Sequence, residues 1–229
     1  MERLVLQDPA GAAAERIAAV ASAGGHIALA GGSTPRAAYE VVAAMDADWS
    51  GCTLWFGDER CVAPTDVLSN YAMVREALLD RLAGRPPAVQ RIAGELGPHA
   101  AADAYDQALG EQLTRFDLVL LGLGPDAHCA SLFPHDPALD ERRRLAVGVE
   151  QAGMEPLVPR VTLTLPAINS AKDVLFLVTG SDKAAAVARA FGGATDRGAP
   201  ASLVAPTAGT LTLMMDAAAA AQLPEESRR

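Results

Sequence analysis

The stretch HIALAGGSTPRAAYE, residues 26–40, joins a short apolar run to a helix-like segment through two glycines. A short apolar run of this kind is typical of a strand that is buried on both faces. Gly31 and Gly32 allow a tight turn, and Pro35 suits the first turn of a helix. The stretch therefore predicts a strand, a turn and a helix in succession, which is the building unit of a parallel sheet.

The same alternation runs along the rest of the chain. Strand-like runs cover residues 3–7, 26–32, 52–58, 116–124, 145–150, 161–166, 173–180 and 210–216. Helix-like segments cover residues 10–23, 36–47, 69–82, 99–113 and 183–191, and the stretch AGRPPA (83–88) is expected to end the third of them. Strands that alternate with helices predict an α/β fold, a mainly parallel sheet with helices on both faces. We expect residues 1–229 to form a single domain.

Composition limits the class of protein. Half of the 229 residues are hydrophobic, yet no apolar run reaches the roughly 18 residues that a membrane-spanning helix needs. The N-terminal residues lack the pattern of a secretory signal, so we expect a cytoplasmic protein without a membrane partner. Cys52, Cys61 and Cys129 are odd in number and lack paired spacing, which indicates free thiols rather than disulfides.

The charge balance is acidic. The chain has 19 Lys and Arg against 28 Asp and Glu, a net charge of −9, and the one short basic run is ERRR at 141–144. Nucleic acid is therefore not an expected partner. A site for an anionic ligand must be built locally, from a few cations and backbone amides.

The turn after the strand at 26–32 is the first candidate site. Ligands of parallel sheets bind beyond the carboxyl ends of the strands. Gly31 and Gly32 let the backbone approach a ligand, Ser33 and Thr34 offer hydroxyls, and the following helix begins with unpaired amides. No lysine follows the glycines, so this is not a Walker loop. The turn predicts a phosphate cradle, although a plain turn with Thr34 as the helix cap explains it equally well.

Charged residues follow the next strand. Asp58, Glu59 and Arg60 come directly after an apolar run, where charges need partners or a solvated cleft. Asp58 and Arg60 together can orient a polyol and polarise a carbonyl group. On spacing alone, a surface turn with a local ion pair is the simpler interpretation.

The stretch GLGPDAHCASLFP, residues 122–134, follows another apolar run. A neutral imidazole at His128 can take a proton from water, and Asp126 can fix its tautomer or contact a substrate. A structural role for a lone histidine is the commoner case. Cys129 is a poor candidate nucleophile because adjacent side chains point apart, and His128 and the cysteines lack zinc-ligand spacing, so no metal site is expected.

Two cations lie near other strands. Arg160 begins the run RVTLTLP, and Lys183 falls in the first turn of an expected helix, where a cation opposes the helix dipole. An anion should offset this placement. Either Asp182 provides it, or a bound phosphate shared with Arg160 and the Ser33 turn does.

Five motifs in order resemble one known family. LAGGSTP, WFGDERCVAPTDVLSNY, LLGLGPDAHCASLFP, PRVTLTLPAIN and TGSDKA are similar to those of the glucosamine-6-phosphate isomerase/6-phosphogluconolactonase family, and within it to the 6-phosphogluconolactonases. The resemblance implies a modified doubly wound α/β fold. It also implies hydrolysis of 6-phospho-D-glucono-1,5-lactone to 6-phosphogluconate in the oxidative pentose phosphate pathway, without a metal or an organic cofactor.

The resemblance also implies a role for each matching residue. His128 would be the general base, and Asp58, Arg60 and Asp126 would line the sugar site. The residues that would hold the 6-phosphate are Gly31, Gly32, Ser33, Thr34, Arg160 and Lys183. The chain departs from the family's Gly-His-Thr at Ala127-His128-Cys129. We expect the methyl group of Ala127 to disfavour a positive φ, and Cys129 to be a weaker hydrogen-bonding group than threonine.

Two other functions are alternatives to the lactonase. Glucosamine-6-phosphate deaminases share a similar block but follow the histidine with a catalytic glutamate, whereas here CASLFP follows and the next carboxylate is Asp136. A non-catalytic sugar-phosphate-binding module is the other alternative, and such effector domains normally accompany a DNA-binding segment, which this chain does not show. The lactonase is the favoured prediction, with a small sugar phosphate lactone as ligand and a monomer or small homo-oligomer as the expected state.

Overall fold

Seven parallel strands form the centre of the molecule in a computed structural model that describes residues 1–224. Their order across the sheet is β1-β10-β9-β6-β2-β3-β5, and every neighbouring pair runs in the same direction. Their bounds are β1 (Glu2–Val5), β2 (His26–Leu29), β3 (Thr53–Phe56), β5 (Ala88–Val89), β6 (Leu118–Leu121), β9 (Asp173–Val178) and β10 (Thr210–Met215). The expected mainly parallel α/β sheet is confirmed.

The strand order reverses between β2 and β6. From β2 the chain continues outward to β3 and β5, whereas from β6 it continues in the opposite direction to β9 and β10. All four residues of β6 are buried, because both neighbouring strands and both faces are covered. In open α/β sheets a crevice forms at such a reversal, beyond the carboxyl ends of the two strands.

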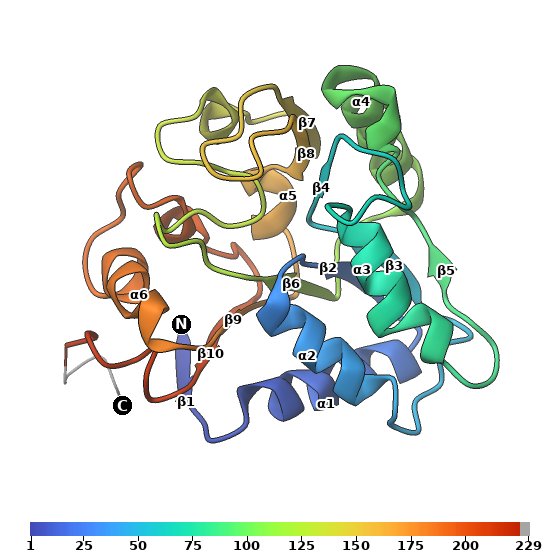
Figure 1. Cartoon of the computed structure of the whole chain (residues 1–229), viewed down its shortest axis with the longest axis horizontal. Coiled ribbons are helices and arrows are strands. Elements are labelled where there is room, and N and C mark those ends of the chain that lie inside the picture. The colour runs from blue at the N-terminus through green and yellow to red at the C-terminus, as the bar shows by residue number, and fades with distance from the viewer. Residues whose placement is uncertain (225–229) are drawn as a thin grey trace.

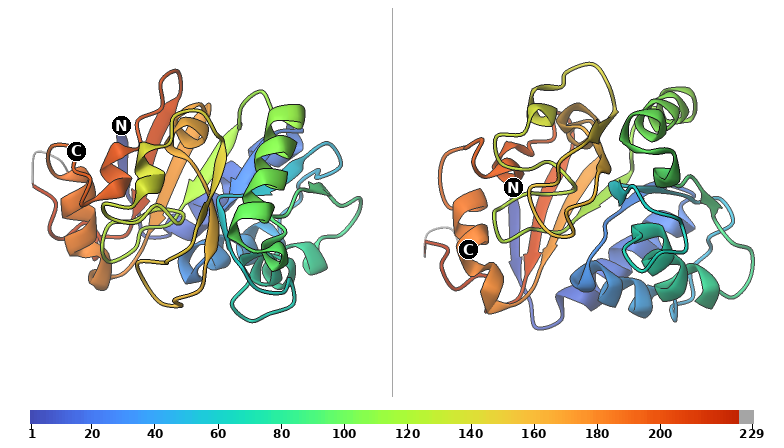
Figure 2. Two further views of the ribbon diagram at one scale, coloured as in Figure 1. Left: turned by 90° about the horizontal axis from the view of Figure 1, so that it is seen from above. Right: turned by 45° about the horizontal axis from the view of Figure 1, so that its top comes forward.

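Within residues 1–224, six helices surround the sheet. They are α1 (Pro9–Ser22), α2 (Ser33–Val42), α3 (Asn70–Ala77), α4 (Pro98–Gln112), α5 (Leu165–Asn169) and α6 (Ala184–Phe191). The short 3₁₀ turns within residues 1–224 are η1 (Leu79–Arg81), η2 (Gly94–Leu96), η3 (Pro137–Asp140), η4 (Ser181–Lys183) and η5 (Pro200–Leu203). Figures 1 and 2 show α1 and α2 on one side of the sheet and α4 on the other, so helices cover both faces as expected. Across residues 1–224, no helix has the length and apolar character to span a membrane.

A second, three-stranded sheet lies on the α4 side and was not expected. It consists of β4 (Asp58–Arg60), β8 (Arg160–Leu163) and β7 (Ala146–Val149), and both of its pairings are antiparallel. The segments that form β7 and β8 were correctly predicted as strands, but their sheet was not. Apolar periodicity identifies a strand without giving its direction or its partner.

Gly57 joins the two sheets. Its amide donates to the carbonyl of Leu29 in β2, at 2.8 Å, and its carbonyl accepts from the amide of Leu163 in β8, also at 2.8 Å. The apolar run expected as one strand over 52–58 is therefore divided into β3 and β4. This division brings the charged residues that follow Gly57 into the second sheet.

Two further expectations about elements were wrong in detail. The helix expected over 69–82 ends at Ala77, before the Pro/Gly-rich stretch 83–88, and the edge strand β5 begins at Ala88, the last residue of that stretch. The strand expected over 161–166 ends at Leu163, where Thr164 caps the short helix α5 by accepting from the amide of Ala167. Proline-rich and Thr-Leu-rich stretches support either state locally, so tertiary pairing decides between them.

Tyr105 fastens α4 to the central sheet. Its buried hydroxyl accepts from the amide of Phe56 at 2.8 Å and donates to the carbonyl of the same residue at 3.0 Å. Its ring also lies 5.9 Å from that of Trp55. A single hydroxyl therefore satisfies both backbone groups of Phe56, at the end of β3, where the pairing with β5 has already ended at Leu54.

Replacing Tyr105 by phenylalanine should lower the free energy of unfolding by about 1–3 kcal/mol, because the backbone N–H and C=O of Phe56 would stay buried without partners. Urea unfolding at neutral pH measures this change. The matched control is Tyr71→Phe, since Tyr71 is only half-buried and its ring contact with Phe56 is retained. Equal stability of the two variants would contradict the role of the Tyr105 hydroxyl.

Candidate active site

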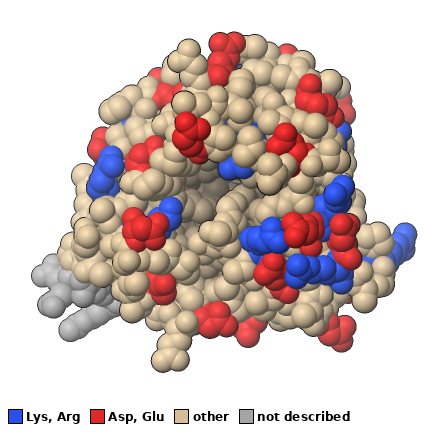
Figure 3. Space-filling model, viewed as in Figure 1, with Lys and Arg blue, Asp and Glu red and all other residues tan. Residues whose placement is uncertain are grey.

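A cleft of about 240 Å³ opens where the strand order reverses, between the carboxyl ends of the parallel strands and the second sheet. Figure 3 shows the hollow near the centre of this face, with basic and acidic side chains at its rim. The predicted residues that line it are Gly31, Gly32, Ser33, Thr34, Asp58, Arg60, His128, Arg160 and Lys183. The remaining predicted residue, Asp126, stands behind the imidazole of His128. Tertiary structure thus brings all of the predicted residues together.

The glycine turn after β2 has the conformation that a cradle needs. Gly32 has a φ of 102°, which is accessible to glycine but strained for other residues. A Cβ atom on Gly31 would lie 2.1 Å from Oδ1 of Asn70, so only glycine fits there. Because α2 begins at Ser33, Gly32 rather than Thr34 is the N-cap residue. The plain interpretation with Thr34 as cap is therefore wrong, and Ser33 and Thr34 both line the cleft.

Buried hydrogen bonds hold this turn in place. The hydroxyl of Tyr39 accepts from the amide of Ala30 at 2.9 Å and donates to its carbonyl at 2.8 Å. The hydroxyls of Thr34 and Thr179 lie 3.1 Å apart, which links the turn to the end of β9. Thr179 lines the cleft, but sequence reasoning missed it because only the fold places the end of β9 beside the turn.

Lys183 faces the same side of the cleft. It ends the turn η4 and is the N-cap residue of α6, one position earlier than the expected first turn. Its ammonium group lies 3.9 Å from the carboxylate of Asp182, and three quarters of the Asp182 side chain is exposed. An exposed carboxylate at this distance holds the ammonium weakly, which leaves the ammonium available to an anion in the cleft.

His128 is held by Asp126 in a defined orientation. Nδ1 of His128 lies 2.5 Å from Oδ1 of Asp126, and the amide of His128 donates to the same oxygen at 3.1 Å. A carboxylate partner places the proton on Nδ1, which leaves Nε2 with a lone pair. Gly124 allows this approach, since a Cβ atom there would lie 2.1 Å from Nδ1. The arrangement gives the imidazole the geometry of a general base.

Ala127 contradicts the expectation about its backbone. Its φ is 66°, in the left-handed region, although it carries a methyl group. This conformation costs about 1–2 kcal/mol for a residue other than glycine. The methyl group is fully buried, the amide donates to the carbonyl of Gly124, and the carbonyl accepts from the amide of Ala201. Tertiary contacts therefore hold the turn in the conformation that a glycine would adopt.

The pKa of Asp126 reflects two opposing effects. Partial burial raises it, but the hydrogen bonds and the charge of His128 outweigh burial and keep the pKa below the usual value for aspartate. Asp126 therefore contributes stability that is present above its ordinary pKa, about 4, and is lost as pH falls through the lower folded-state value.

Replacing Asp126 by asparagine should reduce the free energy of unfolding at about pH 5, and the difference from the wild type should shrink toward about pH 3. Urea unfolding at both pH values measures it. Asp80→Asn is the control, because Asp80 is exposed and pairs with Arg75 only at 3.6 Å. A deficit that persists unchanged in acid would contradict the assigned role of the Asp126 charge.

Asp58 is a buried carboxylate with partners from three other segments. Nδ2 of Asn70 donates to its carbonyl and to its Oδ1, at 2.9 and 3.0 Å, and the hydroxyl of Ser131 donates to its Oδ2 at 2.6 Å. The guanidinium of Arg160 lies 4.0 Å away. The expected surface turn with a local Asp58–Arg60 pair is therefore wrong, since the nearest cation is Arg160.

The two arginines of the cleft are anchored through backbone carbonyls. Arg60 donates from Nη1 to Leu68 at 2.6 Å, and Arg160 donates from Nη2 to Met154 and Pro156 at 3.2 and 3.0 Å. The Nε atoms of both arginines are buried without a partner among residues 1–224. Burial lowers the pKa of Arg160, and the charge of Arg60 adds to this while Asp58 opposes it.

Asn70 lines the cleft and the buried Glu59 holds it in place, and sequence reasoning assigned a role to neither. The buried carboxylate of Glu59 accepts from the amides of Arg60, Asn70 and Tyr71 and from the hydroxyl of Ser69. These bonds fix the start of α3, where Asn70 contacts both Asp58 and Gly31. Burial raises the pKa of Glu59, although the four donors oppose the rise. Ser69, the N-cap residue of α3, was the one local signal that a helix begins at Asn70.

The thiol of Cys129 is buried beside the imidazole. Burial raises its pKa to about 12, so at neutral pH it stays protonated and is a poor nucleophile. Cys52 is likewise buried, and all three cysteines are unpaired. Among residues 1–224, no group of three or more His, Cys, Asp or Glu side chains is arranged to hold a metal ion.

The fold and the cleft define a class: a doubly wound α/β protein with an Asp-His pair and a glycine-rich turn at the carboxyl edge of its sheet. The family model described as glucosamine-6-phosphate isomerases/6-phosphogluconolactonase matches residues 4–213. The chain therefore belongs to this family, as its motifs predicted.

Named relatives agree with this membership. The 6-phosphogluconolactonase of Streptomyces coelicolor is 43% identical over 190 residues, which cover 77% of this chain and 72% of that protein. The human 6-phosphogluconolactonase is 38% identical over 210 residues, 90% of this chain and 80% of that protein. Among solved structures, the 6-phosphogluconolactonase from Trypanosoma cruzi superimposes with a TM-score of 0.84 at 27% identity, over 97% of this chain and 96% of that chain.

A relative with the other family activity has the same fold. A monomeric glucosamine-6-phosphate deaminase superimposes with a TM-score of 0.84 over 97% of this chain and all of that chain, at 20% identity. This likeness shows the fold alone. The fold class is confirmed, and it does not by itself distinguish the two activities of the family.

Proposed function

We propose that this protein hydrolyses 6-phospho-D-glucono-1,5-lactone to 6-phosphogluconate, the lactonase step of the oxidative pentose phosphate pathway. Relatives that carry the name 6-phosphogluconolactonase at 37 to 43% identity support this activity. The observation that carries the proposal is the Asp126–His128 pair at 2.5 Å, which aims a base into a cleft that also contains a glycine-rich cradle and Lys183.

The cradle side of the cleft would anchor the 6-phosphate. The N-terminus of α2, the hydroxyls of Ser33 and Thr34, and the ammonium of Lys183 supply amides, hydroxyls and one positive charge. Phosphate binding there would use energy from a remote part of the substrate to position C1 at the base. Arg160 was predicted to join this anchor. Its guanidinium lies 4.0 Å from the carboxylate of Asp58, a residue proposed to contact the sugar, so its part in phosphate binding stays a prediction.

The chemistry at C1 needs one base and hydrogen-bond donors. Nε2 of His128 takes a proton from water as the water oxygen bonds to C1 and the carbonyl becomes an oxyanion. The guanidinium of Arg60 and the amides of the glycine turn, which line the cleft, are the candidate donors to that oxyanion. As the carbonyl re-forms, the bond from C1 to the ring oxygen breaks, and the imidazolium gives its proton to that oxygen. Asp126 stabilises the imidazolium throughout, and Asp58 would orient sugar hydroxyls.

The two alternatives predict different products. A deaminase would release ammonia from glucosamine 6-phosphate, and a binding module would bind 6-phosphogluconate without accelerating lactone hydrolysis. Within the loop that follows His128, residues 129–134 carry no carboxylate to act as a second acid, which favours the lactonase. We further propose a cytoplasmic enzyme, monomeric or a small homo-oligomer, that acts on a small sugar phosphate lactone and has no nucleic-acid partner.

Replacing His128 by alanine should lower kcat by about 10²-fold or more, because the general base is lost. Lactone generated from glucose 6-phosphate provides the substrate, and hydrolysis is measured above the spontaneous rate. The matched control is His99→Ala, an exposed histidine that pairs with Glu150 on the surface. A near-wild-type rate in the His128 variant would overturn its assignment as the base.

Replacing Lys183 by alanine should raise KM by roughly tenfold, with a smaller effect on kcat, because a charge-assisted contact with the phosphate is lost. The matched control is Lys172→Ala, since Lys172 is the other lysine of the chain and pairs with Asp117. Steady-state kinetics on the same lactone separate the two constants. An unchanged KM in the Lys183 variant would place the anchor elsewhere.

A further inference from the structure

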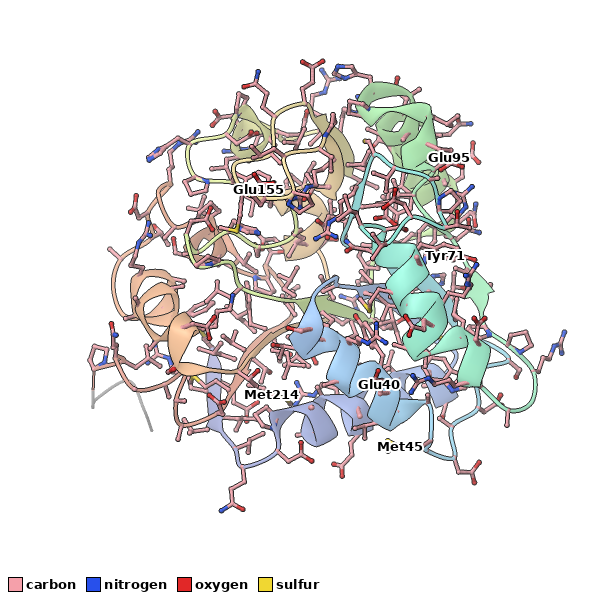
Figure 4. The ribbon with its side chains drawn as sticks, in the orientation of Figure 1. Glu40, Met45, Tyr71, Glu95, Glu155 and Met214 are labelled. Carbon is pink, nitrogen blue, oxygen red and sulfur yellow. The ribbon has the colours of Figure 1, made fainter. Side chains whose placement is uncertain are left out.

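Asn70 is a buried polar residue of the cleft wall that the proposed mechanism does not use. It begins α3, is 2% exposed and lines the cleft together with Gly31. Figure 4 labels the next residue of the helix, Tyr71. The backbone of Asn70 is fixed, because its amide donates to Oε1 of Glu59 at 2.7 Å. A polar side chain held in a protein interior needs a partner for each of its polar atoms.

Asp58 sets the orientation of the Asn70 side-chain amide. Nδ2 of Asn70 donates to the carbonyl oxygen of Asp58 at 2.9 Å and to its Oδ1 at 3.0 Å. A reversed amide would direct its own oxygen at these two oxygens, and an amide oxygen has no proton to donate. The nitrogen of the amide therefore faces Asp58, and the oxygen of the amide faces away from it.

That amide oxygen, Oδ1 of Asn70, is an acceptor without a donor. It accepts no hydrogen bond from any group of residues 1–224. It lies against the glycine turn, since a Cβ atom on Gly31 would come within 2.1 Å of it. Oδ1 is not one of the fully enclosed unpartnered atoms of this part of the chain, so a ligand in the cleft can reach it.

The proposed phosphate anchor beside Oδ1 consists of groups that can donate. They are the amides at the start of α2, the hydroxyls of Ser33 and Thr34, and the ammonium of Lys183. A phosphate dianion has only acceptor oxygens, so it suits these groups and cannot serve Oδ1. A hydroxyl can donate to Oδ1. A phosphorylated polyol therefore supplies the partner for the anchor and the partner for Oδ1 in one molecule.

Resting on the proposed lactonase function, we propose that Asn70 is a specificity-determining residue whose Oδ1 accepts a hydrogen bond from a hydroxyl of the sugar. This hydrogen bond selects a phosphorylated polyol over inorganic phosphate, because only the polyol has a hydroxyl to donate. Asp58 and Glu59 hold the amide in place before the ligand arrives, so little side-chain freedom is lost on binding.

Replacing Asn70 by alanine should weaken the binding of 6-phosphogluconate by roughly five- to tenfold, because the hydroxyl contact is lost. The affinity for inorganic phosphate should stay within about twofold of the wild-type value, because the anchor is retained. Calorimetry measures both ligands. An equal loss for the two ligands would assign Asn70 to the frame of the anchor and overturn the proposal, and so would an unchanged affinity for 6-phosphogluconate.

A series of 6-phosphogluconates that each lack one hydroxyl identifies the donor. One member of the series should bind the wild type and Asn70→Ala alike, since it lacks the hydroxyl that Oδ1 accepts, and the other members should keep the full difference. Asn70→Ser, a milder change at the start of the helix, should show the same pattern and provides the test if the alanine variant does not fold.

Ser131→Ala is the matched control. It removes the other side-chain hydrogen bond to Asp58, at 2.6 Å, and leaves Oδ1 of Asn70 in place. The same pattern across the series in the Ser131 and Asn70 variants would mean that Asn70 acts only through Asp58, which would overturn the proposal. These measurements need no turnover. Failure of the wild-type protein to hydrolyse the lactone would instead overturn the proposed function, so the two failures are distinguishable.

Discussion

The buried carboxylate of Asp58 constrains the whole cleft. A charge removed from water must be surrounded by donors or paired, or the fold loses several kcal/mol. The partners that Asp58 finds are Asn70 at the start of α3, Ser131 after β6 and Arg160 in β8. These segments are far apart in the sequence. The hydrogen bonds and the ion pair of one carboxylate therefore bring both sheets and α3 into contact at Asp58. Asp58 itself lines the cleft.

The electrostatics of the cleft differ from those of the chain. The protein carries a net charge of −9, yet Arg60, Arg160 and Lys183 all face one hollow. Arg60 and Arg160 are held in place by hydrogen bonds from their terminal nitrogens to backbone carbonyls of nearby loops. Local placement of a few cations thus gives an acidic protein a site suited to an anionic sugar phosphate.

Several parts of the fold and site were predictable from local pattern. The parallel strands, the helix start at Asp8-Pro9 and the glycine turn of the cradle follow from apolar periodicity and from turn and capping residues. The second sheet and the short edge strand β5 could not be predicted in this way, because pairing partners and strand direction carry no local signal. Ala127 shows the same limit at one residue: its intrinsic preference opposes a φ of 66°, and surrounding contacts override it.

The sequence by itself determined the family and the residue types available at the ends of the strands, because its motifs and periodicities are local properties of the chain. Only the tertiary structure decided how those residues combine. It paired His128 with Asp126, moved the cation beside Asp58 from Arg60 to Arg160, and added Asn70, Thr179 and Glu155 to the cleft. The physical reason is that burial, hydrogen-bond geometry and charge compensation depend on which distant segments meet, and no spacing within one segment encodes that.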